Sequence, residues 1–184
     1  DTIMECWAGL LNISDTFEDF GWKLKACIEL QPQLTQMAKA IDPDILVTND
    51  IYAEEWKHWT HLVGKIRMLV GGFPCVMLST AGKQLMHEDP RASALMDTVK
   101  MAEFFAVRMV FLENVPALVD EEQVHGMLKQ ADDRLQAAGL HRVAVWRQQH
   151  SQCGGASQRS RVLLTWLESE MVHSMGPLQT TFAG

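Results

Sequence analysis

Residues 2–10 have the sequence TIMECWAGL, an apolar strand pattern that runs directly into a glycine turn. A second apolar run, KLKACIE, covers residues 23–29 and ends in an acid. Between the two runs Ser14 or Asp15 can cap a short helix, and Gly21 can end it. Strand, glycine turn, helix and strand in this order predict a βαβ unit, the building block of a doubly wound sheet.

The same alternation of short apolar runs and amphipathic segments continues along the chain. Strands are expected at residues 2–7, 23–29, 45–48, 67–70, 109–112, 142–146 and 161–166. Helices are expected at residues 15–20, 32–41, 54–63, 92–107 and 121–138. Helix 32–41 has Leu34, Met37, Ala38 and Ile41 on one face. The pattern predicts an α/β fold with a Rossmann-like, doubly wound and mostly parallel sheet.

The ends of the predicted strands carry conspicuous residues. In doubly wound sheets, ligands bind at the carboxyl ends of the strands. The residues found at these ends are Ala8-Gly9, Glu29, Asp50, Cys75 and Glu113-Asn114. A polar stretch at residues 79–91 follows Cys75 and is expected to be functional, because long loops inside compact domains usually are. The pattern predicts a site at this edge of the sheet without identifying its chemistry.

The composition is that of a globular domain. The chain has 184 residues, a mass of 20.7 kDa and 47% hydrophobic residues, which suffices for one domain with its own core. Its net charge of −7 argues, taken alone, against a nucleic-acid-binding protein, which normally has a basic face.

Cysteine and histidine spacing predicts no metal site. The cysteines are widely spread, lack a CxxC pair and are expected to be free thiols in a reducing compartment. His58 and His61 have no third ligand nearby. Acidic residues occupy the place of a signal peptide's basic region, and no apolar run is long enough to span a bilayer. An intracellular protein without a membrane segment is expected.

Residues 71–75, GGFPC, resemble the cytosine-C5 DNA methyltransferases, in which a Pro-Cys pair presents the catalytic thiolate. The resemblance extends in register over residues 3–167. Further matching segments are the cofactor turn ECWAGL (5–10), the catalytic-loop segments STAGKQ (79–84) and EDPR (88–91), the Glu-Asn-Val motif FLENV (111–115) and the paired-arginine motif QRSR (158–161).

The resemblance implies a sheet of the S-adenosylmethionine-dependent methyltransferase type and methyl transfer to C5 of a flipped-out cytosine in DNA. Cys75 would be the nucleophile that adds to the base at C6. Glu113 would hold the cytosine N3 and amino group, and Arg159 and Arg161 would orient the base O2.

The resemblance also implies a cofactor site and a substrate loop. The expected ligands of S-adenosylmethionine are Trp7, Ala8, Gly9, Leu10, Glu29, Leu30, Asp50, Ile51 and Pro74. Among them, Glu29 would accept hydrogen bonds from the ribose hydroxyls, as acids at second-strand ends do in dinucleotide-binding folds. The expected substrate-loop residues are Ser79, Gly82, Lys83, Gln84, Arg91 and Asn114.

Several positions depart from the family pattern. Leu11-Asn12 stand where the family's cofactor turn usually has two further glycines, and Val76 stands where a Gln usually follows the cysteine. Ser157 stands where a Gln often precedes the paired arginines.

The family places a target-recognition region and two closing motifs after the paired arginines, and residues 162–184 are too few for either. Residues 1–167 are therefore expected to be the catalytic domain, and 168–184 a C-terminal tail, truncated where a recognition domain would follow.

Three interpretations of this chain are open. It is a fragment or isolated catalytic core, an enzyme whose second subunit or missing domain recognises the DNA target, or a non-catalytic, regulatory module that binds cofactor, DNA or a partner. Methylation of RNA cytosine is a further alternative. A DNA methyltransferase would act in the nucleus of a eukaryote or the cytoplasm of a bacterium.

Overall fold

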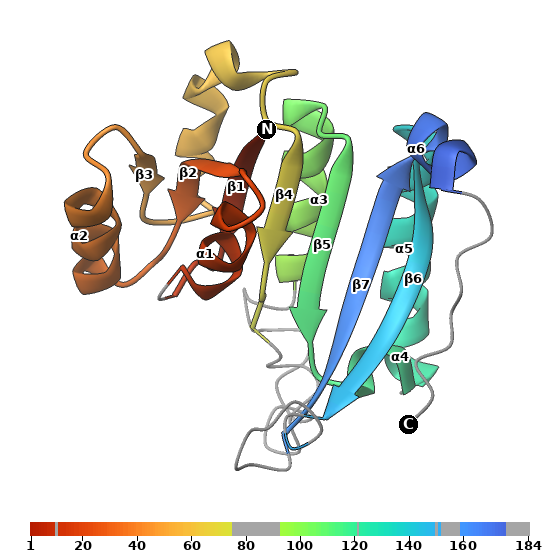
Figure 1. Cartoon of the computed structure of the whole chain (residues 1–184). Helices are drawn as coiled ribbons and strands as arrows, with labels where there is room; N and C mark the ends of the chain where they lie inside the picture. Colours follow the sequence, from red (N-terminus) through yellow and green to blue (C-terminus); the bar gives the residue numbers. More distant parts are fainter. Residues whose placement is uncertain (10, 75–92, 121, 150, 152–158, 176–184) are drawn as a thin grey trace.

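One mixed sheet forms the centre of the molecule (Figure 1), as a computed structural model of the chain shows. The structure describes residues 1–184 except 10, 75–92, 121, 150, 152–158 and 176–184. The seven strands have the order β3-β2-β1-β4-β5-β7-β6. They are β1 (Thr2–Cys6), β2 (Lys23–Ile28), β3 (Leu46–Thr48), β4 (Met68–Gly71), β5 (Met109–Asn114), β6 (Leu140–Gln149) and β7 (Ser160–Glu168).

Strands β1 to β5 are parallel, and β7 pairs antiparallel with both β5 and β6. This arrangement confirms the α/β, doubly wound and mostly parallel fold predicted from the sequence. The carboxyl ends of the five parallel strands meet at one edge, which is the lower edge in Figure 1.

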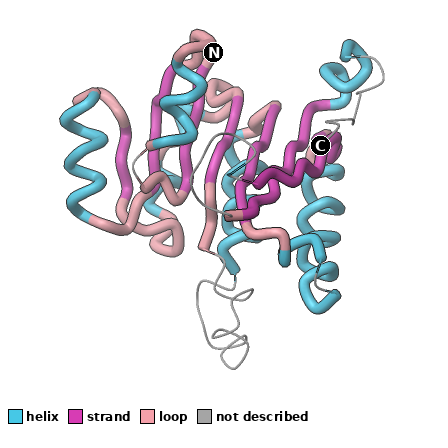
Figure 2. Tube along the Cα trace, turned by 60° about the horizontal axis from the view of Figure 1, so that its bottom comes forward, coloured by secondary structure: helices cyan, strands magenta, loops and turns pink. Residues whose placement is uncertain are grey.

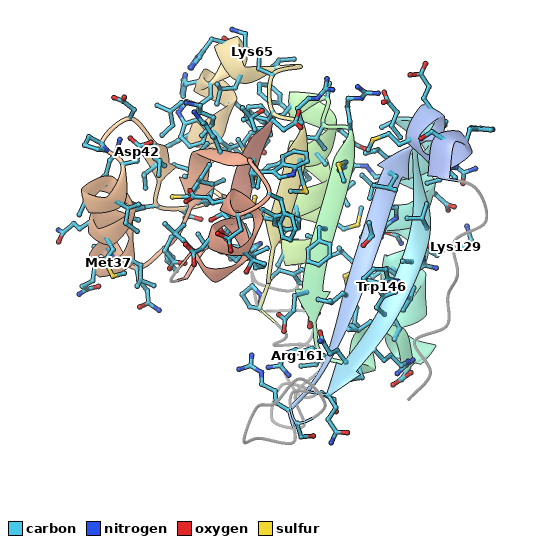
Figure 3. All side chains as sticks on the ribbon, in the orientation of Figure 1. Met37, Asp42, Lys65, Lys129, Trp146 and Arg161 are labelled. Carbon is cyan, nitrogen blue, oxygen red and sulfur yellow. The ribbon has the colours of Figure 1, made fainter. Side chains whose placement is uncertain are left out.

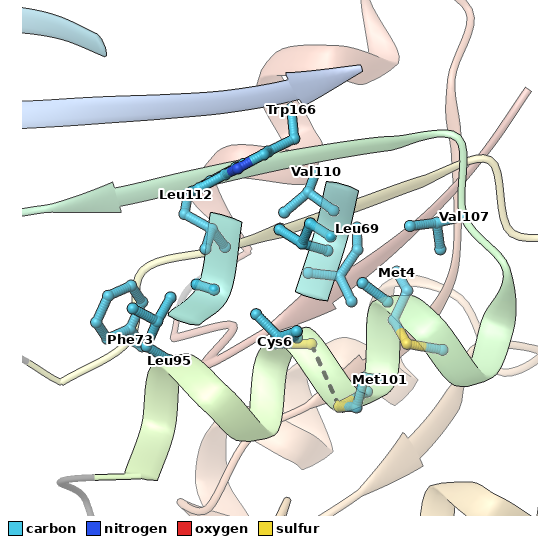
Figure 4. Close-up of a cluster of buried hydrophobic side chains, with 14 of the residues drawn as sticks. Met4, Cys6, Leu69, Phe73, Leu95, Met101, Val107, Val110, Leu112 and Trp166 are labelled. Carbon is cyan, nitrogen blue, oxygen red and sulfur yellow. Dashed lines mark hydrogen bonds between the residues drawn. The ribbon is translucent and has the colours of Figure 1, made fainter. Parts of the chain in front are cut away.

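Helices cover both faces of the sheet (Figures 1 and 2). They are α1 (Asn12–Glu18), α2 (Pro32–Ile41), α3 (Ala94–Phe105), α4 (Ala117–Asp120), α5 (Glu122–Ala137) and α6 (Ser169–Met175). Helices α3 and α5 pack on one face, in a core that includes Cys6, Met101 and Trp166 (Figure 4). On the other face α1 and α2 enclose a second cluster, which includes Ile3, Leu24 and Val70. None of the described helices has the length and apolar character of a membrane-spanning segment.

The two faces of β5 are buried to different extents. Val110, Leu112 and Asn114 are buried toward α3 and α5, whereas the alternate residues of the strand, on the α1 side, are only half-buried. Strand β7 shows the same alternation. The α1 side of β5 and β7 is therefore the more open face, and it carries the Glu113 and Arg161 side chains.

Several segments differ from the sequence-based expectation. Helix α1 begins at Asn12, directly after the left-handed Leu11, so Ser14 and Asp15 lie inside the helix and do not cap it, and α4 was not expected. Residues 54–63 form two short 3₁₀ helices, η1 (Glu55–His58) and η2 (Thr60–Leu62), instead of one helix. Burial of Trp56, whose indole N–H donates to the Ile51 carbonyl oxygen, draws this segment tightly against the core. The tail also contains α6, although its sequence shows little pattern.

The apolar face of α2 is only partly used in the core. Ala38 is buried and Leu34 is half-buried, whereas Met37 and Ile41 are exposed. The small residues Thr35 and Ala38 form the buried side of the helix. They let the helix lie close to the sheet and leave the longer apolar side chains on its flank.

Candidate functional site

The turn after β1 has an unusual backbone. Trp7, Gly9 and Leu11 all have positive φ, at 60°, 52° and 59°. This region favours glycine, and non-glycine residues occupy it at an energetic cost. Backbone hydrogen bonds hold the turn to the neighbouring strand, since the Ala8 N–H donates to the Ile28 carbonyl oxygen at 3.1 Å.

Glu29 joins this turn to the end of β2. It is 9% exposed, and its Oε2 accepts a hydrogen bond from the Gly9 N–H at 2.7 Å. Its Oε1 accepts from the Gln31 N–H at 2.9 Å. Each carboxylate oxygen has a second lone pair. Glu29 can therefore support the loop and still accept a hydroxyl from a ligand.

Glu5 supports the turn from the β1 side, and the sequence analysis did not single it out as a site residue. It is 1% exposed, and its Oε2 accepts from the Ser14 N–H in the first turn of α1 at 3.0 Å. Burial raises the pKa of Glu5 to about 7, against the lowering effect of hydrogen bonds from Ser14 and Ile13. The sequence feature that could have identified Glu5 is its position as an acid inside the apolar run of residues 2–7. Glu5 and Glu29 thus hold the two ends of the turn.

An aromatic pair borders the turn on its other side. The Trp7 indole N–H donates to Thr98 Oγ1 at 3.3 Å, and the ring packs edge-to-face on Tyr52 with centroids 5.9 Å apart. Because the hydrogen bond to Thr98 of α3 fixes the indole, the ring forms one wall of the candidate site at the carboxyl end of β1. Thr98 and Tyr52 were missed because nothing in the sequence links them to residue 7.

The remaining expected cofactor residues differ in accessibility. Asp50 is half-buried, and its Oδ1 accepts from the Tyr52 N–H at 2.8 Å, which shapes the turn after β3. Ile51 is 2% exposed and its carbonyl oxygen binds Trp56, so its side chain belongs to the core. Leu30 is 65% exposed beside Glu29, and Pro74 is half-buried.

An ion pair lies where β5 and β7 meet. Arg161 Nε is 2.5 Å from Glu113 Oε1, and the antiparallel register places these residues at the same end of the sheet. Figure 3 shows Arg161 at this edge. Arg159 precedes β7 and is exposed. The structure therefore brings Glu113 together with one of the two predicted arginines.

The chain that leads to Cys75 passes beside this pair. A Cβ at Gly72 would lie 3.2 Å from Glu113 Oε2. Asn114 is 3% exposed, and its Nδ2 donates to the Phe73 carbonyl oxygen at 2.9 Å. Its Oδ1 accepts from the Val115 N–H at 2.8 Å. Asn114 therefore ties the end of β5 to the segment after β4, and its side chain does not face the open side of the sheet.

Several predicted site residues lie outside the described residues. They are Leu10, Cys75, Ser79, Gly82, Lys83, Gln84 and Arg91. Their roles stay predictions. Within the described part of the chain, no group of three or more His, Cys, Asp or Glu residues is arranged to hold a metal ion.

The sequence matches the family model described as C-5 cytosine-specific DNA methylase over residues 2–180. It is 28% identical to Type II methyltransferase M.NgoMIV of Neisseria gonorrhoeae over 92% of this chain and 52% of that protein. It is 28% identical to M.NaeI of Lentzea aerocolonigenes over 91% of this chain and 40% of that protein. With M.PspPI of Psychrobacter sp. (strain TA137) it shares 30% identity over 66% of this chain and 29% of that protein. The chain thus spans about half or less of these relatives.

Solved structures share the fold at low sequence identity. The Entamoeba histolytica methyltransferase EhMeth matches with a TM-score of 0.69 and 12% identity, over 90% of this chain and 52% of that one. A Spodoptera frugiperda DNMT2 mutant matches with a TM-score of 0.65 and 16% identity, over 99% of this chain and 53% of that one.

Proposed function

The chain belongs to the C-5 cytosine-specific DNA methylase family, and on this premise we propose that residues 1–167 are the catalytic domain of a DNA (cytosine-5-)-methyltransferase that uses S-adenosylmethionine. The observation that carries the proposal is the Glu113–Arg161 ion pair beside the segment that leads to Pro74 and Cys75. Covalent activation of a pyrimidine requires a nucleophile together with an acid and a cation that hold the base, and the sequence supplies a cysteine directly after Pro74.

The proposed reaction begins with addition of the Cys75 thiolate to C6 of a cytosine taken out of the base stack. The electron pair of the C5–C6 double bond shifts to form a C4–C5 double bond, the C4–N3 π pair passes to N3, and C5 becomes nucleophilic as the carbon of an enamine. One oxygen of Glu113 accepts a hydrogen bond from the amino group, and a proton held between its other oxygen and N3 neutralises the charge that gathers at N3. Arg161 fixes the Glu113 carboxylate and, with Arg159, orients the base O2. S-adenosylmethionine supplies the electrophilic methyl group. Loss of the C5 proton to a base and expulsion of the thiolate complete the cycle.

Residues of the β1 turn and the β2 end are proposed to bind S-adenosylmethionine. Each carboxylate oxygen of Glu29 has a lone pair that the Gly9 and Gln31 N–H groups do not use. These lone pairs accept hydrogen bonds from the ribose hydroxyls. Trp7 forms a wall for the adenine or methionine part, supported by its bond to Thr98. Asp50, which follows β3, contacts the cofactor at the end of that strand. Ile51 is buried and supports the floor of the cofactor site from the core.

DNA recognition is proposed to come from a part of the enzyme outside residues 1–184, either further chain or a second subunit. Two observations support this. The chain covers only 29–52% of the cited bacterial relatives, and its net charge of −7 is unsuited to tight binding of a polyanion. Because DNA is the proposed substrate, we propose that the protein acts inside the cell.

Mechanism-based trapping tests the proposal. DNA that carries 5-fluorocytosine cannot lose the substituent at C5, so the enzyme should stay covalently attached after methyl transfer. We expect a denaturation-resistant adduct that requires S-adenosylmethionine and is abolished by Cys75→Ser, whereas Cys153→Ser retains it. Absence of an adduct with all DNAs, with or without a recognition partner, would contradict the proposal. Tight cofactor binding without any adduct would instead assign the chain to a non-catalytic module, and an adduct only with RNA would move the substrate to RNA.

A further inference from the structure

Gly72 lies directly beside Glu113. Strand β4 ends at Gly71, and the parallel register pairs Gly71 with Leu112 of β5. The residues that follow these two, Gly72 and Glu113, are therefore neighbours at the carboxyl edge of the sheet. A Cβ at Gly72 would lie 3.2 Å from Glu113 Oε2, closer than most contacts that a Cβ atom makes in proteins. The Glu113 carboxylate thus occupies the space that a side chain at residue 72 would need.

The backbone conformation gives no reason for a glycine at residue 72. The described glycines with positive φ are Gly9, Gly21, Gly64 and Gly139. Gly72 is not one of them, so other residues can adopt its conformation without strain. What distinguishes the position is its contact with the Glu113 carboxylate.

The chain is fixed on both sides of Gly72. Gly71 packs so closely on β1 that a Cβ there would lie 2.6 Å from the Cys6 carbonyl oxygen. Phe73 is 7% exposed in the core that α3 covers (Figure 4), and its carbonyl oxygen accepts from Asn114 Nδ2 at 2.9 Å. Because the backbone is held at both neighbours, a Cβ at residue 72 would displace the Glu113 carboxylate and not the chain.

Arg161 confines the carboxylate from the opposite side. Its Nε is 2.5 Å from Glu113 Oε1, and β7, which carries Arg161, pairs with β5 on the side away from β4. The Arg161 and Glu113 side chains are 25% and 29% exposed, so surrounding atoms restrict both of them. The carboxylate is therefore held between the guanidinium on one side and the bare backbone of Gly72 on the other.

We propose that Gly72 is a positioning residue, which sets the place of the Glu113 carboxylate by leaving space for it. This inference rests on the proposed function, in which Glu113 holds the cytosine ring. Glu113 must meet N3 and the amino group of the base at the same time. A displacement of the carboxylate by a few tenths of an ångström, which a Cβ at residue 72 would cause, therefore weakens both contacts. Gly72 acts through Glu113 and need not contact the base.

A double-mutant cycle tests the proposal, with the rate of adduct formation on 5-fluorocytosine DNA as the readout. Gly72→Ala should slow adduct formation by roughly tenfold, since misplacement by about 1 Å can cost around 10²-fold. Glu113→Asp shortens the acid by one methylene and slows the reaction by itself. In a chain that carries Glu113→Asp, the shorter carboxylate leaves room for the added methyl group. Gly72→Ala should then slow the reaction further by about twofold or less. An equal loss in both backgrounds would show that Gly72 serves only the packing of the chain and would overturn the proposal.

The ion pair provides a second readout that does not require catalysis. In a chain labelled with ¹⁵N-arginine, the Arg161 Nε–H resonance, assigned by its loss in Arg161→Lys, reports the bond to Glu113. Gly72→Ala should shift this resonance. Gly126→Ala is the matched control and should not shift it, because a Cβ at Gly126 has nothing within 4 Å.

The two readouts separate this proposal from the proposed function. An Arg161 resonance that is the same in Gly72→Ala and in the unmodified chain would overturn the role of Gly72. A shifted resonance in Gly72→Ala, together with no adduct from the unmodified chain, would contradict the proposed function and still support the placement of the carboxylate by Gly72.

Discussion

At the scale of single residues, the proposed chemistry depends most on the Glu113 carboxylate. Glu113→Gln keeps the size of the side chain but removes the charge that pairs with Arg161. We expect methyl transfer to slow by roughly 10²–10³-fold, as with loss of one electrostatic stabiliser. Because the pair is partly exposed, stability should change by about 1 kcal/mol or less. Glu168→Gln, which alters the acid paired with Arg108 at the far end of β7, should leave the rate unchanged. Equal rate losses in both variants would contradict a role for Glu113 in the reaction.

Asn114 is expected to act through the segment that its side chain holds, Gly72 to Pro74. Asn114→Asp removes the N–H donor that binds the Phe73 carbonyl oxygen and places an acid beside it. The segment leading to Cys75 should shift, and misplacement by about 1 Å can cost around 10²-fold in rate. We expect kcat to fall while the dissociation constant for S-adenosylmethionine, measured by calorimetry, stays the same. Asn49→Asp, at an exposed position, is the control. A parallel loss of cofactor affinity would show that Asn114 supports the fold generally.

At the scale of elements, the burial of Glu5 between β1 and α1 makes the stability of the fold dependent on pH. The fold raises the pKa of Glu5 from 4.5 to about 7, so the folded state favours the neutral acid. The stabilising contribution is complete below about pH 4.5 and is lost as the pH rises through about 7, at a cost of about 3 kcal/mol. Glu5→Gln should remove this dependence. In urea titrations, the variant should gain stability relative to the unmodified chain between these pH values. A constant difference across the range would contradict the assignment.

The close approach of β4 to β1 requires a glycine. A Cβ at Gly71 would lie 2.6 Å from the Cys6 carbonyl oxygen, so Gly71→Ala must separate the two central strands. We expect a loss of roughly 1–3 kcal/mol in unfolding free energy, typical of overpacking. Gly126→Ala in α5 has nothing within 4 Å of its Cβ and should stabilise the helix by about 0.5–1 kcal/mol. In thermal unfolding, Gly71→Ala should lower the melting temperature and Gly126→Ala should raise it. A shift of both melting temperatures in the same direction would contradict the packing argument.

At the scale of the whole molecule, the strands of the sheet could be predicted from the sequence, whereas most side-chain contacts at the edge of the sheet could not. Apolar runs located all seven strands, but strand order and the antiparallel insertion of β7 depend on long-range pairing that no local pattern specifies. The inward direction of Asn114 could have been deduced, since it alternates with Glu113 along β5. The bond from Trp7 to Thr98 could not, because 91 residues separate the partners.

The charge of the whole chain leads to a last prediction about DNA. With a net charge of −7, residues 1–184 should bind duplex DNA more weakly than about 10⁻⁴ M at physiological salt, the weak end of non-specific binding. M.NgoMIV extends well beyond the matched region, which is 52% of its length. Fusing the rest of that protein to this chain should tighten DNA binding and steepen its salt dependence, because each further phosphate contact releases more counterions. Cofactor affinity should change far less than DNA affinity. Fluorescence anisotropy with labelled duplexes at several salt concentrations measures both chains. If the unfused chain binds DNA as tightly as the fusion does, recognition lies within residues 1–184, and the proposal of an external recognition part is wrong.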